Sequence, residues 1–154
     1  MGRVIFMCGP AGSGKSTVAR RYERQGMTRL SVDQEAWSRG ITAMPLPDDV
    51  HREIEDALRA RLLDLVRAGS DVVLDFSFWS RAKRDEYRAL LRPLGVVPET
   101  VYLATGRATA LGRIAARAAG DGDDFKLSPE LAAFYFDHFE IPTPAEGPLT
   151  VIGS

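Results

Sequence analysis

Residues 9–17 constrain the fold of this chain more than any other segment, and they read Gly-Pro-Ala-Gly-Ser-Gly-Lys-Ser-Thr. A short apolar run at residues 4–8 precedes them, and a helix-like segment at residues 16–25 follows. A continuous apolar run of this length is typical of a strand that is covered on both faces. The order of strand, glycine-rich turn and helix predicts that the turn lies at the carboxyl end of a strand in an α/β fold.

The spacing of this turn fits the Walker A pattern, in which a glycine is followed by four residues and then by Gly-Lys-Ser. Its glycines allow backbone angles and a close approach that a Cβ atom would block, so that N–H groups at a helix start can surround a phosphate. We therefore expect ATP as the ligand, with Lys15 reaching the β- and γ-phosphates and Ser16 providing a hydroxyl ligand to Mg²⁺. The predicted nucleotide-binding residues in this turn are Gly9, Ala11, Gly12, Ser13, Gly14, Lys15, Ser16 and Thr17.

Short apolar segments alternate with helical segments along the rest of the chain. Strands are expected at residues 27–32, 71–75, 101–103 and 149–152, and helices at residues 49–68, 81–92, 108–119 and from 129 onward. This order predicts an α/β three-layer sandwich of the P-loop NTPase kind, with a five-stranded parallel sheet and its site at the carboxyl ends of the strands. At this length we expect a single domain over residues 1–154, with a small helical lid at about residues 107–128.

Composition excludes several classes of protein. The 20 Lys+Arg and 21 Asp+Glu residues give a net charge of -1, which lacks the basic footprint of a dedicated nucleic-acid binder. The single cysteine, Cys8, excludes an intramolecular disulfide and a multi-cysteine metal cluster. No apolar run approaches the ~20 residues that a membrane span needs, and no secretory signal peptide precedes the first strand. We therefore expect a cytoplasmic protein without a membrane partner.

Other residues indicate which kind of P-loop protein this is. The chain contains no asparagine, so the Asn-Lys-x-Asp motif that reads guanine in GTPases is absent. Asp75 ends the apolar run at residues 72–74, but Phe76 stands where a hydrolytic ATPase carries a glutamate. We expect Asp75 to hold Mg²⁺ together with Ser16; the alternative is that Asp75 bonds nearby backbone or an arginine.

Three charged side chains have the positions that phosphate transfer requires. Asp33 follows the strand at residues 27–32, where its carboxylate would accept the proton of an attacking hydroxyl; alternatively it caps the next turn. Arg113 and Arg117 lie four residues apart, hence on one helix face, where they would stabilise the transferring phosphoryl group or remain solvated. The predicted catalytic residues are Lys15, Asp33, Arg113 and Arg117, and Arg113 is also expected to bind the nucleotide.

Aromatic residues cluster after the strand ends that would face the acceptor. They would form an apolar wall for a ring-bearing small molecule; alternatively, the phenylalanines belong to the core and the tryptophans pack the lid. The arginines at 81 and 84 would hold an acidic substituent or lie on the solvent face of their helix. The predicted substrate contacts are Asp33, Trp37, Phe78 and Arg81.

With these features the chain resembles small P-loop kinases of the AAA_33 and zeta-toxin-like group, which includes chloramphenicol phosphotransferase and the kinase module of bacterial polynucleotide kinase. The resemblance is carried by residues 9–17, 30–33 and 73–77 and by the arginines at 81, 84, 113 and 117. It implies that Asp33 is the general base and that Arg113 and Arg117 belong to a lid over ATP. One departure is Asp75-Phe76-Ser77-Phe78, where polynucleotide kinases often have Asp-Ala-Thr-Asn.

The sequence thus favours a phosphotransferase that uses ATP and Mg²⁺ and acts on a hydroxyl of a small molecule, such as an antibiotic or a metabolite. A second hypothesis keeps the enzyme class and makes a 5′-hydroxyl of RNA or DNA the acceptor, which the near-neutral charge disfavours. A third is a regulatory module whose nucleotide state controls a protein partner.

Overall fold

Five parallel strands form the centre of the molecule. The computed structural model describes residues 2–10, 12–41, 46–76, 78–117 and 128–153. The strands are β1 (Val4–Cys8), β2 (Thr28–Leu30), β3 (Val72–Leu74), β4 (Glu99–Ala104) and β5 (Leu149–Gly153). They lie in the order β2-β3-β1-β4-β5, and every neighbouring pair is parallel. The prediction of a five-stranded parallel sheet is confirmed.

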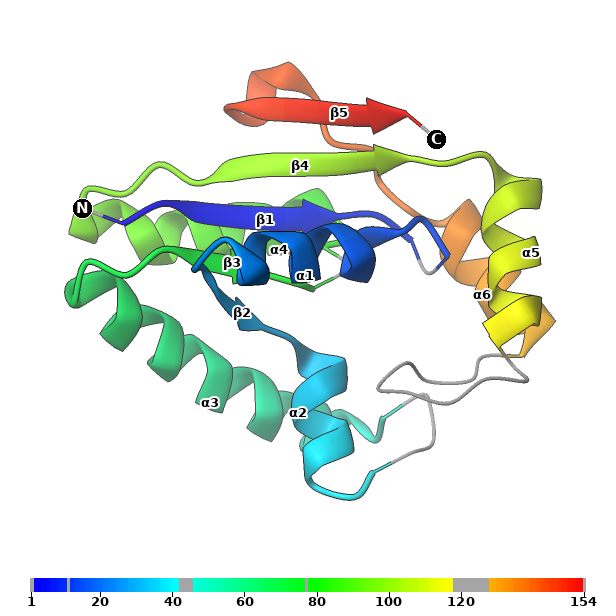
Figure 1. Cartoon of the computed structure of the whole chain (residues 1–154), viewed down its shortest axis with the longest axis horizontal. Coiled ribbons are helices and arrows are strands. Elements are labelled where there is room, and N and C mark those ends of the chain that lie inside the picture. Colours follow the sequence, from blue (N-terminus) through cyan, green and yellow to red (C-terminus); the bar gives the residue numbers. More distant parts are fainter. Residues whose placement is uncertain (1, 11, 42–45, 77, 118–127, 154) are drawn as a thin grey trace.

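Helices connect the strands and cover the sheet (Figure 1). They are α1 (Lys15–Arg24), α2 (Val32–Ser38), α3 (Asp48–Arg67), α4 (Arg81–Leu91), α5 (Arg107–Arg117) and α6 (Pro129–Asp137), with 3-10 turns η1 (Arg92–Leu94) and η2 (Pro144–Glu146). Figure 1 shows α5 and α6 beyond the arrowheads of the strands, at the carboxyl end of the sheet. The segment in which a helical lid was expected contains α5, and its residues 118–127 lie outside the described residues.

The side chains of β1 alternate between two apolar layers. Val4, Phe6 and Cys8 pack in a core cluster with residues of α3 and α4, whereas Ile5 and Met7 pack with Ala19 of α1 on the other face. Because both faces of the strand are covered, all five residues of β1 are apolar and buried. The three-layer sandwich is the packing that this pattern predicts.

The segment after β2 differs from the prediction. The sequence favoured a strand over residues 27–32, but β2 ends at Leu30 and α2 begins at Val32. Ser31 is the N-cap of α2, and its side chain accepts a hydrogen bond from the backbone N–H of Gln34 at 3.1 Å. A capping serine followed by two helical turns thus replaces the end of the expected strand. Within the described residues, no helix is both long and apolar enough to cross a membrane.

Candidate active site

The glycine-rich turn after β1 adopts the backbone conformation that its composition predicts. Gly12 and Gly14 have φ angles of 82° and 91°, in the left-handed region that side chains with a Cβ rarely adopt. A Cβ atom on Gly9 would lie 2.5 Å from the hydroxyl oxygen of Ser13, which is buried under the turn. Ala11 lies outside the described residues. The turn therefore depends on glycine for both its angles and its close packing.

The N-terminus of α1 is built differently from those of α2, α4 and α6. Three helices have a serine cap whose side chain accepts a backbone hydrogen bond, at Ser31, Ser80 and Ser128. The N-cap of α1 is Gly14, which has no side chain, and the first turn of this helix contains no acid. The first N–H groups of a helix have no partner within the helix, and its dipole favours a negative charge there. With Lys15 in the first turn, this end of α1 is suited to bind phosphate.

Asp75 and Lys15 are joined by an ion pair at the carboxyl end of the sheet. The Nζ atom of Lys15 donates to Oδ1 of Asp75 at 2.7 Å, and the guanidinium of Arg29 on β2 donates to Oδ2 at 3.0 and 3.1 Å. The Asp75 side chain is fully buried, and burial alone would raise its pKa. The two cations outweigh that effect and hold the pKa of Asp75 below its ordinary value. This carboxylate is therefore ionised. Its contact with Arg29 agrees with the predicted alternative that Asp75 bonds an arginine.

The predicted magnesium ligands have the chemistry that the ion requires. Ser16 follows Lys15 in the first turn of α1 and is partly buried, and Asp75 is the carboxylate that Lys15 contacts. Hydroxyl and carboxylate oxygens are hard ligands, and Mg²⁺ is commonly held by one or two such groups together with phosphate oxygens. Among the described residues, no group of three or more His, Cys, Asp or Glu side chains forms a separate metal site. The donor set fits a metal that arrives with a nucleotide.

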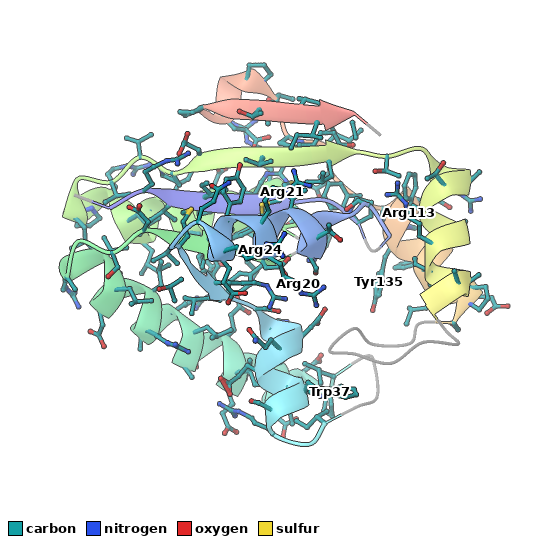
Figure 2. All side chains as sticks on the ribbon, in the orientation of Figure 1. Arg20, Arg21, Arg24, Trp37, Arg113 and Tyr135 are labelled. Carbon is teal, nitrogen blue, oxygen red and sulfur yellow. The ribbon has the colours of Figure 1, made fainter. Side chains whose placement is uncertain are left out.

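Helix α5 rests directly on the glycine-rich turn. The Nη1 atom of Arg113 donates to the carbonyl oxygen of Gly12 at 3.2 Å, and Thr105 Oγ1 donates to the carbonyl oxygen of Ser13 at 3.0 Å. Figure 2 shows Arg113 on the side of α5 that faces this turn. Arg117 is the last residue of α5, and the position of its side chain lies outside what the structure describes. The structure thus brings Arg113 to the predicted phosphate site.

Asp33 lies in the first turn of α2 and is partly buried. The alternative that Asp33 caps this helix is wrong, because Ser31 is the cap. Asp33 stands at the carboxyl end of β2, which the sheet order separates from β1 by one strand, β3. Its carboxylate therefore belongs to the same end of the sheet as Lys15 and Asp75.

The predicted acceptor residues have different environments. Trp37 on α2 is 43% exposed, and Arg81 is exposed at the start of α4, 3.5 Å from Asp85. Phe78 is 1% exposed, and its ring stacks on that of Phe6 with the centroids 4.5 Å apart. The prediction of Phe78 as a substrate contact is wrong, because its ring is part of the core. Apolar side chains are needed there to cover the face of the sheet.

Both predicted roles of Arg84 are wrong, because this side chain is completely buried. Its Nε atom donates to Glu146 at 2.8 Å, and its Nη1 atom donates to the carbonyl oxygen of Phe78 at 2.6 Å. Phe78 has a φ angle of 49°, which is unusual for a residue other than glycine. Arg84 thus fixes the segment after β3 in a strained conformation. The sequence contained no signal for this, since Glu146 lies 62 residues away.

Sequence reasoning also missed Arg29, the second cation on Asp75. The available signal was a charged residue inside a strand whose neighbours are buried, since such a charge requires a partner. The exposed pair of Arg107 and Asp137, at 3.0 Å, was likewise not predicted, and it joins α5 to α6.

Comparison with known proteins supports this description of the fold. The family AAA_33, described as an AAA domain, matches residues 4–140. A comparison with curated proteins finds no match. Among solved structures, an unliganded sugar kinase from Janibacter sp. is 21% identical with a TM-score of 0.66, and the match covers 99% of this chain and 86% of that chain.

Two further solved structures are similar in fold. A gluconokinase from Sinorhizobium meliloti is 23% identical with a TM-score of 0.64, and the match covers 99% of this chain and 82% of that chain. A chain of the Pnkp1/Rnl/Hen1 RNA repair complex is 16% identical with a TM-score of 0.76, over 89% of this chain and 43% of that chain. At these identities the likeness establishes a kinase-like P-loop fold.

Proposed function

Because the chain belongs to the AAA_33 family and has a kinase-like P-loop fold, we propose that it is a phosphotransferase that moves the γ-phosphate of ATP to a hydroxyl of a small molecule. The observation that carries this proposal is the uncapped N-terminus of α1, where Lys15 contacts Asp75 and Arg113 contacts the glycine-rich turn. The side chains of Lys15 and Arg113 and the positive end of the α1 dipole are thus all found at the glycine-rich turn. Such an arrangement suits a triphosphate.

In the proposed reaction, backbone N–H groups from Gly12 to Thr17 bind the phosphates. Lys15, Arg113 and Arg117 offset the negative charge that spreads over the transferring phosphoryl group. Ser16 and Asp75 would hold Mg²⁺, which would offset part of the negative charge of the phosphates.

Asp33 is the proposed general base. Its carboxylate would accept the proton of the acceptor hydroxyl while that oxygen attacks the γ-phosphorus atom, and ADP would leave. Trp37, on the same helix as Asp33, would then lie beside the acceptor, with Arg81 as a further proposed contact. Because phosphoryl transfer depends mainly on alignment and charge neutralisation, an ordinary carboxylate suffices for this role.

The acceptor can be identified by screening ATP consumption against hydroxylated metabolites, sugars and antibiotics. We expect one class of compound to gain a single phosphoryl group, detected by product mass. Consumption of ATP at the same slow rate with every compound, together with nucleotide-dependent binding of a protein, would instead indicate the regulatory module. Labelling of an oligonucleotide with a free 5′-hydroxyl tests the second kind of acceptor.

The Asp33→Asn variant tests the base. We expect turnover to fall by about 10²-fold or more while ATP affinity stays nearly unchanged, because the amide cannot accept the proton. Glu35→Gln is the matched control, since Glu35 is the other acid in the first turn of α2 and contacts Arg39. Full activity of Asp33→Asn would remove Asp33 from the base role.

A further inference from the structure

Arg29 on the edge strand β2 is a buried cation without a role in the proposed reaction. Its side chain is 4% exposed, and its strand neighbour Leu30 belongs to the apolar core. Transfer of a guanidinium from water to such a place is costly unless a carboxylate offsets it. The partner is Asp75, whose own side chain is fully buried. Apolar residues can often replace a buried ion pair without loss of stability. A pair that is present at this depth is therefore a candidate for a functional role.

The two oxygens of Asp75 are divided between two cations. Arg29 binds Oδ2 through Nε and Nη2, whereas Lys15 binds Oδ1 through Nζ. The backbone N–H of Asp75 also donates to the carbonyl oxygen of Leu30 at 2.8 Å, which ties the start of the segment after β3 to β2. Arg29 therefore holds the carboxylate from the side of the sheet and leaves Oδ1 directed toward the glycine-rich turn.

Lys15 cannot keep its full ion pair with Asp75 while its ammonium group binds the phosphates of a nucleotide. If Lys15 moves its ammonium group to the phosphates, as the proposed function requires, Oδ1 of Asp75 loses its partner. A fully buried carboxylate with no counterion would be strongly unfavourable, so Lys15 would remain on Asp75 unless a second cation stayed behind. Arg29 is that cation, since its two hydrogen bonds lie on the other oxygen.

We propose that Arg29 is a positioning residue of the nucleotide site: it holds Asp75 through Oδ2 and thereby allows Lys15 to exchange Oδ1 for the phosphates. This inference rests on the proposed function only in that Lys15 binds a nucleotide phosphate. It implies that Arg29 matters most when no divalent cation is present. If Asp75 holds Mg²⁺ as proposed, the charge of that ion would compensate the carboxylate in place of the lysine.

The test compares ATP affinity with and without Mg²⁺ for the wild-type chain and for Arg29→Met. In EDTA, we expect the variant to bind ATP about tenfold more weakly. The reason is that Lys15 would stay on Asp75, so that one charge-assisted bond from Lys15 to a phosphate would be lost. With Mg²⁺, we expect a smaller loss. Arg88→Met is the matched control, because Arg88 is a largely buried arginine that pairs with Glu146 instead of Asp75, and we expect it to leave both affinities unchanged.

Removal of the carboxylate provides the decisive background. In Asp75→Asn, Lys15 has no ion pair to leave, so adding Arg29→Met should no longer weaken ATP binding in EDTA. If Arg29→Met alone does not fold, Arg29→Gln replaces it, since it removes the charge and retains a donor. Equal losses with and without Mg²⁺, or an unchanged loss in the Asp75→Asn background, would overturn the inference and assign Arg29 a structural role.

These outcomes also separate the inference from the proposed function. A wild-type chain that binds no ATP under either condition would contradict the nucleotide site itself. A wild-type chain that binds ATP while the Arg29 variants bind it equally well would contradict the role of Arg29 alone. Thermal unfolding of each variant shows whether a lower affinity reflects a smaller folded fraction.

Discussion

Replacement of Gly12 by alanine tests how closely α5 is seated on the glycine-rich turn. A Cβ atom at Gly12 would lie 2.2 Å from the carbonyl oxygen of Ala110, whereas ordinary contact begins near 3.4 Å. The helix backbone would have to retreat by about 1 Å, or the turn would have to deform. The same substitution also forces an L residue into the left-handed region at a φ of 82°.

Gly40 separates these two costs, because it has the same φ of 82° and, apart from its chain neighbours, no atom of the described residues lies within 4 Å of its added Cβ. Gly40→Ala should therefore carry only the backbone cost, about 1 kcal/mol once the lower entropy of the unfolded chain is counted. Gly12→Ala adds the cost of overpacking, about 1–3 kcal/mol. The difference between the two variants measures the contact between the turn and α5.

Urea unfolding followed by the fluorescence of Trp37 and Trp79 gives the free energy of unfolding of each variant. We expect the variant at Gly12 to be the less stable of the two by at least about 1 kcal/mol. If both variants lose the same stability, then α5 yields without cost. Helix α5 would then not be firmly seated on the glycine-rich turn.

Three further predictions follow from the charges and burial around the site. Arg113→Ala should slow phosphate transfer by about 10²-fold or more and weaken ATP binding less, as measured by single-turnover kinetics; equal losses would make Arg113 a ground-state ligand. Burial opposes ionisation of Glu146, but hydrogen bonds from Arg84 and Arg88 prevail and lower its pKa from 4.5 to about 2. Its contribution to stability is therefore complete above about pH 4.5 and lost as the pH falls toward 2, and Glu146→Gln should flatten this part of the unfolding profile. Burial raises the pKa of the Cys8 thiol to about 12, so an alkylating reagent at pH 8 should modify Cys8 only in urea; rapid labelling of the folded chain would contradict this.

Local signals predicted most of the elements correctly. The apolar run of β1 and the glycines of the turn act over a few residues, and each has the predicted structure. The helix expected from residue 129 onward begins there, after the N-cap Ser128. The wrong prediction at the end of β2 also has a local cause. Ser31 is compatible with a strand end and with a helix cap, but only as the cap does its side chain accept the hydrogen bond from the Gln34 N–H.

The partners of the charged residues required the fold. Asp75 was predicted from its place at a strand end, but its contacts come from β2 and α1, 46 and 60 residues earlier in the chain. Arg84 was expected either to hold an acidic substituent or to lie on the solvent face of its helix, yet it is buried against Glu146. A strand-end position predicts where a side chain stands, whereas its hydrogen-bond partner depends on how distant segments pack.

The amino-acid order by itself determined the glycine-rich turn and the alternation of strands and helices, because both follow from interactions between residues close in the chain; the parallel sheet was inferred from that alternation. Tertiary packing alone decided that Phe78 lies in the core, that α5 touches Gly12 and that Lys15 and Arg29 share one carboxylate. The physical reason is that burial and ion pairing depend on which segments meet. In a parallel sheet, neighbouring strands are necessarily distant in sequence.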